Sequence, residues 1–315
     1  MEQTSDQLNS TDARFDREFN MAGDKLPAEE GMLVERLADD AAFVVRGARL
    51  LERRQTPFQL IEVWDTPRFG RLFRLDGCFM TSERDEFHYH ENLAHVAGVA
   101  HASPRRALVL GGGDGGSAEE LLKHPSIERV DIVELDAGVV DIARHYFPAV
   151  HRGAFDDPRV KLHIGDALVH VEALCAQGEA ARVDLIVFDL TDPVGAARAL
   201  FTHDFFALCR KLLLPGGALS LQVGSASFQG EQVRTVLKAL RATFRRVQPY
   251  VTHVPLYGSL CVFAVASDTL DASAITTEEV DARIAARGLG ELQHYNAAVH
   301  CAQFALPNHL RGLLD

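Results

Sequence analysis

Residues 107–117 limit the possible folds of this chain more than any other segment. They read Ala-Leu-Val-Leu-Gly-Gly-Gly-Asp-Gly-Gly-Ser, so a short apolar run typical of a buried strand enters five glycines interrupted by one aspartate. Ser117 and the residues after it are typical of a helix start, with the serine as N-cap. Strand, glycine-rich turn and helix together predict the first unit of a nucleotide-binding α/β sheet, because glycine lets the backbone approach a ligand closely.

Asp114, the one acid in this loop, indicates which ligands the loop accepts. A carboxylate among backbone amides that would otherwise hold a pyrophosphate repels the phosphate charges. We therefore expect an uncharged or cationic nucleoside rather than a dinucleotide.

The apolar pattern divides the chain into three parts. Residues 1–31 are polar and acidic, which predicts a disordered tail. Over residues 32–84, apolar and polar residues alternate between proline and glycine turn signals, which predicts a small N-terminal antiparallel β domain. Residues 85–315 predict a helix followed by β/α alternation, hence a mostly parallel sheet with helices on both faces and a closing hairpin. The expected strands are 107–110, 129–134, 160–164, 184–189, 218–223, 246–251 and 260–267, and the expected helices are 117–124, 137–146, 167–176, 203–213 and 229–243.

Composition excludes several classes of partner. The net charge of −12 argues against nucleic-acid binding, which needs a basic surface. Five scattered cysteines without a C-x-x-C pair predict reduced thiols and neither a disulfide framework nor a zinc site. No apolar run reaches the length of a membrane span, and the first 31 residues lack the apolar core of a signal peptide. We expect a cytoplasmic protein that binds no membrane.

Carboxylates follow four consecutive predicted strands of the parallel sheet. Ligands of such sheets bind beyond the carboxyl ends of the strands, so these acids are expected at one site. Glu134 lies about twenty residues after the loop, where an acid accepts hydrogen bonds from ribose hydroxyls. Asp166, followed by Ala167, suits an adenine amino group, and it is equally well placed to cap the next helix.

The fourth strand end carries two acids, Asp189 and Asp192, in Asp-Leu-Thr-Asp-Pro. The proline disfavours helix at Asp192 and predicts a turn beyond the sheet. Two carboxylates this close could bind a cationic amine, and one could accept its proton. An Asx-turn followed by a helix cap is the alternative. The buried strand leading into the pair favours catalysis.

A cluster of polar residues, Arg-Asp-Glu-Phe-His-Tyr-His-Glu, occupies residues 84–91. His88 and His90 are two residues apart, which does not place them on one helical face, so we predict no metal site. Tyr89 and His90 are expected to reach a ligand from the junction of the two domains. Tyr257 lies in a predicted turn near the last strand, with a solvent-facing tyrosine as the alternative.

Taken together, these motifs resemble the polyamine aminopropyltransferases, the family of spermidine synthase and its relatives. The resemblance extends from about Gln55 to Arg311. The motifs that carry it are Thr56-Pro-Phe-Gln59, Leu75-Asp-Gly77, Asp85-Glu-Phe-His-Tyr-His-Glu91, Gly111-Gly-Gly-Asp-Gly-Gly116, Asp189-Leu-Thr-Asp-Pro193 and His294-Tyr-Asn with His300 and Phe304-Ala-Leu-Pro307.

The resemblance implies a fold and a reaction. The fold is a small β domain on a Rossmann-like, methyltransferase-type sheet. The reaction is transfer of an aminopropyl group from decarboxylated S-adenosylmethionine, a co-substrate, to an amine, without a metal or a further cofactor. The resemblance also implies a homodimer or a homotetramer. The residues implied to hold the donor are Gln59, His90, Asp114, Glu134, Asp166 and Ala167; Asp189 is the implied base, with Asp192, Tyr89 and Tyr257 around the acceptor amine.

Some segments depart from the common family pattern on the acceptor side. Asp189-Leu-Thr-Asp-Pro193 and Thr252-His-Val-Pro255 are more similar to the thermospermine synthase branch, whereas the C-terminal motifs are more similar to spermidine synthases. We expect putrescine as the acceptor and spermidine as the product. Spermidine, agmatine and cadaverine stay open as acceptors, and a methyltransferase that uses S-adenosylmethionine is the more distant alternative.

Overall fold

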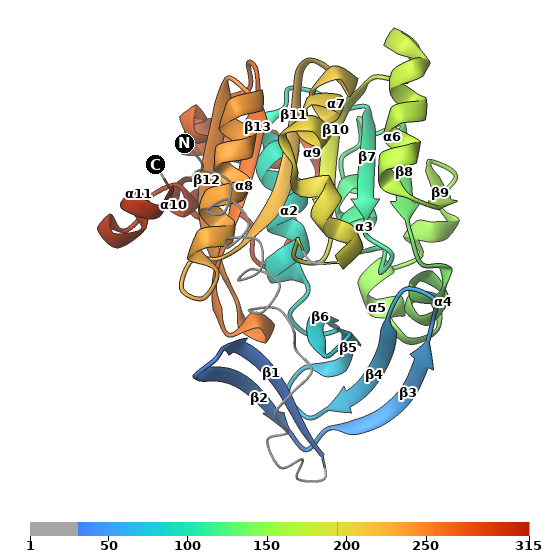
Figure 1. Ribbon diagram of the computed structural model, residues 1–315. Helices are drawn as coiled ribbons and strands as arrows, with labels where there is room; N and C mark the ends of the chain where they lie inside the picture. Colours follow the sequence, from blue (N-terminus) through green and yellow to red (C-terminus); the bar gives the residue numbers. More distant parts are fainter. Residues whose placement is uncertain (1–30, 194, 315) are drawn as a thin grey trace, which may run out of the picture.

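The computed structural model describes residues 31–193 and 195–314. The predicted tail, residues 1–31, lies outside the described residues except for Gly31. Strands of an N-terminal part come first, one long helix follows, and a larger α/β arrangement completes the fold (Figure 1). None of the helices within these described ranges combines the length and the apolar composition that crossing a bilayer requires.

The N-terminal strands are antiparallel and form two small sheets. One contains β1 (Met32–Ala38) and β2 (Ala41–Arg46), and the other has the order β3-β4-β5-β6. Gly47, with a φ of +72°, turns the chain between β2 and β3, which do not pair with each other. The four-stranded sheet is built from β3 (Arg49–Gln55), β4 (Leu60–Thr66), β5 (Gly70–Leu75) and β6 (Cys78–Ser82).

The central sheet has seven strands in the order β12-β13-β11-β10-β7-β8-β9. Neighbours from β11 to β9 are parallel, whereas β13 runs antiparallel to both β11 and β12. The predicted α/β class, mostly parallel sheet and closing hairpin are thus confirmed. Its strands are β7 (Arg106–Gly111), β8 (Arg129–Glu134), β9 (Val160–Ile164), β10 (Val183–Asp189), β11 (Leu213–Ser225), β12 (Arg246–Val254) and β13 (Ser259–Ser267).

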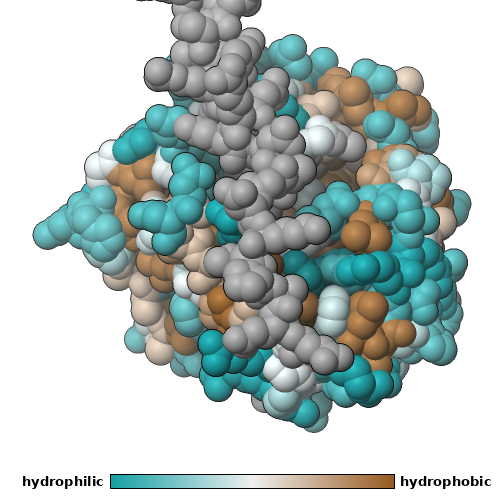
Figure 2. Space-filling model, turned by 60° about the horizontal axis from the view of Figure 1, so that its bottom comes forward, coloured by the Kyte–Doolittle hydropathy of each residue, from teal (hydrophilic) through white to brown (hydrophobic). Residues whose placement is uncertain are grey.

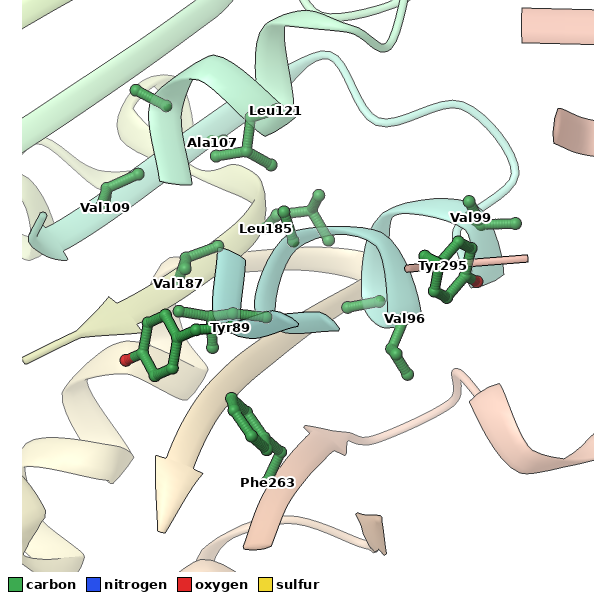
Figure 3. Packing of buried hydrophobic residues seen from close by; sticks show 14 of the residues in the cluster. Tyr89, Val96, Val99, Ala107, Val109, Leu121, Leu185, Val187, Phe263 and Tyr295 are labelled. Carbon is green, nitrogen blue, oxygen red and sulfur yellow. The ribbon is translucent and has the colours of Figure 1, made fainter. Parts of the chain in front are cut away.

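Helices cover both faces of this sheet because successive strand residues point to opposite sides. Val109 packs in one hydrophobic cluster with Val96 of the long helix α2 (Phe87–Ala100), as Figure 3 shows. Its neighbour Leu110 packs in the opposite cluster with Phe205. The remaining helices are α3 (Gly116–Leu122), α4 (Ala137–Tyr146), α5 (Pro148–His151), α6 (Ala167–Ala176), α7 (His203–Leu212), α8 (Gly230–Thr243), α9 (Thr277–Arg287), α10 (Ala297–Gln303) and α11 (Asn308–Leu314).

The four-stranded sheet packs beside α4 through a separate apolar cluster. Ile61 and Val63 of β4 lie there with Val139 and Ile142 of α4, all buried. Hydrophobic residues on the outer face of this end form separate patches among hydrophilic ones in Figure 2. This packing places the N-terminal strands near the carboxyl ends of the central strands.

Strands β7 and β10 are neighbours, yet the chain leaves them toward opposite edges of the sheet, to β8 and to β11. Such a switch point opens a crevice beyond the carboxyl ends of the two strands. The glycine loop follows β7 and Asp189 ends β10, so both lie at this switch point.

Candidate active site

The glycine loop and the end of β10 are tied together through the backbone. Gly112 donates its N–H to the carbonyl oxygen of Asp189 at 2.8 Å. Gly111 pairs with Asp189 in the sheet and has a φ of +77°, and a Cβ atom there would lie 2.1 Å from the same carbonyl oxygen. Only glycine fits this contact, so the sequence of the loop fixes Asp189 beside it.

Asp114 is held at the start of α3. Its Oδ1 accepts a hydrogen bond from the Gly116 N–H at 3.0 Å, and its Oδ2 lies 3.4 Å from Nε2 of His90. Gly116 makes room for the imidazole, because a Cβ atom there would lie 2.3 Å from His90 Cε1. The loop thus presents a carboxylate to a histidine that arrives from α2.

His90 lies between two carboxylates and is backed by a third. Its Nε2 is 3.9 Å from Asp189 Oδ2, and its Nδ1 is 2.8 Å from Glu86 Oε2. Polar atoms of His90, Asp114 and Asp189 all lie within 4.8 Å of one another. These three residues form the centre of the candidate site.

The ionisation of these groups differs. Burial disfavours a charged imidazole, but Asp114, Glu86 and Asp189 outweigh it and raise the pKa of His90 well above its ordinary value. Burial also opposes ionisation of Asp114, yet the charge of His90 lowers the pKa of that carboxyl. For Asp189, burial and the charge of Asp114 raise the pKa to about 6. The site therefore holds one firmly ionised acid and one that exchanges a proton near neutral pH.

Metal binding was predicted to be absent, and the cluster of His90, Asp114 and Asp189 is where a cation would fit by distance. A histidine that binds a metal must offer the lone pair of an imidazole nitrogen. The raised pKa of His90 favours the doubly protonated ring, which offers none. The chemistry of the cluster suits an organic ammonium better than a metal ion, and the absence of a metal stays a prediction.

Glu134 lies at the end of β8, where a ribose was expected. Its Oε1 accepts the backbone N–H of Asp136 at 2.9 Å. Burial raises the pKa of Glu134 to about 7. Gln59 reaches the same strand end from the N-terminal part, where its side-chain amide donates to Asp136 Oδ2 at 3.0 Å.

Asp136 is a member of this group that the sequence argument did not single out. It caps α4, accepting the Gly138 N–H, and it also accepts the Thr56 hydroxyl at 2.6 Å. The signal was present, since an aspartate two residues after a strand-end acid and directly before a helix is a typical N-cap.

Asp166 caps α6. Its Oδ1 accepts the backbone N–H groups of Leu168 and Val169 at 2.7 and 3.2 Å, and Ala167 is the first residue of the helix. The capping alternative is therefore realised. The pair still lies at the end of β9, and the N–H of Gly165 joins this end to Glu134 of β8 through the Glu134 carbonyl at 2.9 Å.

Two tyrosines lie near enough to Asp189 for its charge to act on them. The rings of Tyr89 and Tyr257 are 6.0 Å apart, and Figure 3 shows Tyr89 beside Phe263, with its hydroxyl directed away from Val96. Burial and the charge of Asp189 raise the pKa of Tyr89. Tyr257 is half-buried, and its hydroxyl donates to the Met80 carbonyl at 2.7 Å, so its side chain is fixed against β6.

Asp192 is oriented by two amides. Gln229 and Gln232 donate to its two oxygens at 2.6 and 3.4 Å, and burial raises its pKa. Glu35 of β1 is near enough for the charge of Asp192 to act on it, and burial raises the pKa of Glu35 to about 7. Glu35 lies far from every motif along the chain, so no local signal in the sequence marks it as a site residue.

The structure brings most of the proposed residues to one edge of the central sheet. His90, Asp114 and Asp189 meet directly, Tyr89 and Tyr257 are adjacent, and the charge of Asp189 also acts on Glu134. Gln59 joins through Asp136, and the charge of Asp192 acts on Glu35 of β1.

Residues 86–277 match a family model described as the spermine/spermidine synthase domain. The polyamine aminopropyltransferase of Nitrosomonas europaea is 46% identical over 286 residues, which are 91% of this chain and 86% of that protein. The polyamine aminopropyltransferase of Pyrobaculum calidifontis is 36% identical over 279 residues, or 88% of this chain and 96% of that protein.

Solved structures agree with these sequence relatives. A crystal structure of a spermidine synthase in complex with the transition-state analogue AdoDATO matches with a TM-score of 0.83 and 30% identity. The match covers 93% of this chain and 98% of that one.

Proposed function

This chain belongs to the spermine/spermidine synthase family, an enzyme family whose relatives compared above are polyamine aminopropyltransferases, and we propose that it forms spermidine. The donor in this proposal is decarboxylated S-adenosylmethionine, the acceptor is putrescine, and 5′-methylthioadenosine is the second product. The observation that carries the proposal is the cluster of Asp114, His90 and Asp189 at the switch point of the sheet.

The charge of Asp114 supports the choice of donor. The propylamine end of the decarboxylated donor is a cation, whereas intact S-adenosylmethionine has a carboxylate beside its amine. An ionised Asp114 attracts the first and repels the second. Glu134 would accept the ribose hydroxyls, Asp166 and Ala167 would face the adenine, and Gln59 and His90 would complete the donor site.

Asp189 is the proposed general base. An alkyl ammonium titrates near pH ~10, so the acceptor cannot attack until it loses a proton. Asp189 would take that proton while the amine nitrogen bonds to the carbon next to the sulfonium. The carbon–sulfur bond breaks as the new bond forms, and its electron pair stays on sulfur in neutral methylthioadenosine. The sulfonium is already a good leaving group, so this step calls for no metal or further cofactor.

The acceptor is proposed to have two ammonium groups. Asp189 and Asp192 would bind the reacting end, with Tyr89 and Tyr257 beside it. Glu35 supports a second cationic contact, because a bound ammonium would favour the ionised form that burial now opposes. A diamine as short as putrescine is the proposed occupant, and longer or guanidino acceptors are outcomes of the test. A homodimer or homotetramer and a cytoplasmic location stay predictions.

The decisive experiment measures turnover of the purified protein with decarboxylated S-adenosylmethionine and each of putrescine, spermidine, agmatine and cadaverine. Release of methylthioadenosine and the product mass are followed, with intact S-adenosylmethionine as the parallel donor. We expect spermidine from putrescine and no product from the intact donor. Preference for another amine would correct the acceptor. Methylated product, or no turnover with any amine, would contradict the proposal.

A further inference from the structure

Glu86 is a buried carboxylate next to the site that the reaction above does not use. It directly precedes α2, and its side chain is only 1% exposed. Oε2 lies 2.8 Å from His90 Nδ1, and Oε1 accepts a hydrogen bond from Arg152 Nη2 at 3.0 Å. Both oxygens have fixed partners, so Glu86 acts on the site only through His90.

The imidazole of His90 is held on its other sides as well. Gly116 lies against the ring, and the Tyr89 ring contacts it edge-on at 5.2 Å between centroids. Only Nε2 faces the site, between Asp114 at 3.4 Å and Asp189 at 3.9 Å. Nδ1 of His90 therefore faces Glu86, and Nε2 faces the carboxylates of Asp114 and Asp189.

We propose that Glu86 is a positioning residue that keeps His90 doubly protonated, with the Nε2–H directed between Asp114 and Asp189. When Nδ1–H donates to Glu86, a neutral ring would direct the lone pair of Nε2 at two carboxylates, which repel it. A second proton removes that repulsion. The charged or titratable groups packed around the ring, among the described residues, are Glu86, Tyr89, Asp114 and Asp189, with Arg152 behind Glu86.

The consequence for catalysis rests on the proposed function. Two carboxylates this close share a proton near neutral pH unless a cation lies between them. The imidazolium of His90 supplies that cation. Asp189 can then be deprotonated and ready to accept a proton, while Asp114 stays ionised and binds the cationic end of the donor. Without Glu86, His90 loses its second proton more readily and Asp189 stays protonated to higher pH.

The first test requires no substrate. Nitrogen NMR of histidine-labelled protein reports whether each ring nitrogen of His90 carries a proton. We expect both to be protonated at about pH 7.5 in the unaltered protein, and the Glu86→Gln variant to lose the second proton by about that pH. A neutral His90 in the unaltered protein, or an unchanged doubly protonated ring in Glu86→Gln, would overturn the proposal.

Glu120→Gln is the matched control. Glu120 is equally buried, and its Oε2 lies 2.8 Å from Nε2 of His95, another histidine of α2. Neither Glu120 nor His95 contacts Asp114 or Asp189 in the described structure. The control therefore changes a buried glutamate of α3 that is paired with a histidine of α2, and the His90 signals should stay as in the unaltered protein.

Kinetics form the second test. We expect Glu86→Gln to lower kcat/KM about threefold near pH 6.5 and to approach the unaltered enzyme near pH 9, because the acid limb moves upward by about one pH unit from about pH 6. Glu120→Gln should keep the unaltered profile. An equal loss at every pH would indicate a purely structural role for Glu86 and overturn the inference. If the unaltered protein turns over no amine, the proposed function fails, and the NMR experiment still decides the inference.

Discussion

Asp114 and Asp189 contact the same histidine, yet their carboxyl groups have opposite pKa shifts. Asp114 is the nearer to His90 and also accepts the Gly116 N–H. Asp189 Oδ2 is buried and has no hydrogen-bond partner within the described part of the chain. At the scale of single residues, this difference keeps Asp114 ionised and lets Asp189 gain or lose a proton near neutral pH.

Replacing Asp189 should separate binding from chemistry. We expect Asp189→Asn to lower kcat by about 10²- to 10⁴-fold, the usual range for loss of a general base, while donor affinity changes little. Because the pKa of Asp189 is raised to about 6, kcat/KM of the unaltered enzyme should fall as the pH drops below about 6, where the base becomes protonated. Turnover over a pH series and donor titration measure these effects.

Asp184→Asn is a suitable control for that change. Asp184 lies on the same strand, β10, at the opposite end from Asp189, and accepts the backbone N–H groups of Arg105 and Arg106. Its variant should keep the acid limb of the profile. An acid limb that persists unchanged in the residual activity of Asp189→Asn would show that another group is the base.

Glu134 is expected to destabilise the unliganded protein when it ionises. Its folded pKa of about 7 exceeds the ordinary 4.5, so the free energy of unfolding should fall as pH rises from about 4.5 to 7 and stay lower above. Glu134→Gln removes that loss. Urea unfolding should show the variant about 1–3 kcal/mol more stable near pH 8 and similar near pH 4.5. Glu172 is exposed, and Glu172→Gln leaves Glu134 in place, so that variant should keep the pH dependence of the unaltered protein. A stability difference between Glu134→Gln and the unaltered protein that does not vary with pH would count against this account.

The positions of the acids at the strand ends were predictable from the sequence because the signal is local. A buried strand followed by an acid indicates where that acid will lie. The contact of Gln59 with Asp136 joins residues 77 positions apart, and nothing in either local segment specifies it. Whether Asp166 caps a helix or faces an adenine amino group was equally undecided in the sequence, because both roles use the same residue at the same place.

At the scale of elements, the glycine loop owes its shape to one close backbone contact. Gly111→Ala would place a Cβ atom 2.1 Å from the Asp189 carbonyl oxygen at a φ of +77°. We expect a loss of more than about 3 kcal/mol of unfolding free energy and at least a tenfold loss of turnover, because β7 and β10 must separate.

Gly178→Ala measures how much of the loss in unfolding free energy comes from the positive φ alone, without the close contact. Gly178 has a φ of +71°, close to that of Gly111, but no atom lies within 4 Å of the position of its Cβ. Its alanine variant should lose only about 1–2 kcal/mol and keep full activity. Similar losses for both variants in urea unfolding would show that the contact with Asp189 is unimportant.

Regular elements were predicted best where the apolar period is strong. The strand 129–134 and the helices 137–146 and 167–176 begin and end as expected. Strand β11 extends from Leu213 to Ser225, well beyond the expected 218–223. The turn signals of Pro215-Gly216-Gly217 lie within it, where the register with β10 shifts between the pairs Val183–Leu213 and Leu185–Ala218. Gly216 has a φ of +88° there, so the turn signals mark an irregularity inside the strand and not its start.

At the scale of the whole molecule, Glu91 joins the C-terminal segment to α2. Its buried carboxylate accepts the backbone N–H groups of Gln293, His294 and Tyr295 at 2.7, 2.8 and 2.7 Å. Glu91→Gln would place amide hydrogens against these donors and should cost about 2–4 kcal/mol of unfolding free energy. Hydrogen exchange of α10 should accelerate most.

The same substitution at Glu279 provides a comparison. Glu279 also accepts a backbone N–H, from Thr276 at the start of α9, but at an exposed position. Glu279→Gln should cost less than about 1 kcal/mol and leave exchange in α10 unchanged. Equal effects of the two variants would contradict the assigned role of Glu91.

The α/β class and the two-part organisation were predictable, whereas the contacts between the two parts were not. Tyr257 reaches Met80, and the N–H of Leu256 donates to Asp85 at 2.8 Å, across more than half of the sequence. Such contacts depend on how the two parts of the chain pack against each other. The apolar period within either part carries no information on that packing.

The placement of the side chains by separate segments has a consequence for how such an enzyme can diversify. Asp114 lies in the loop that follows β7 and Glu134 ends β8, while Glu35 and Tyr257 come from β1 and from the turn between β12 and β13. Substitutions in the latter two segments can change the surroundings of Asp192 and Tyr89 and leave Asp114 and Glu134 unchanged. A combinatorial library aimed at new amine products would therefore vary residues of β1 and of this turn and leave the residues at the strand ends unchanged.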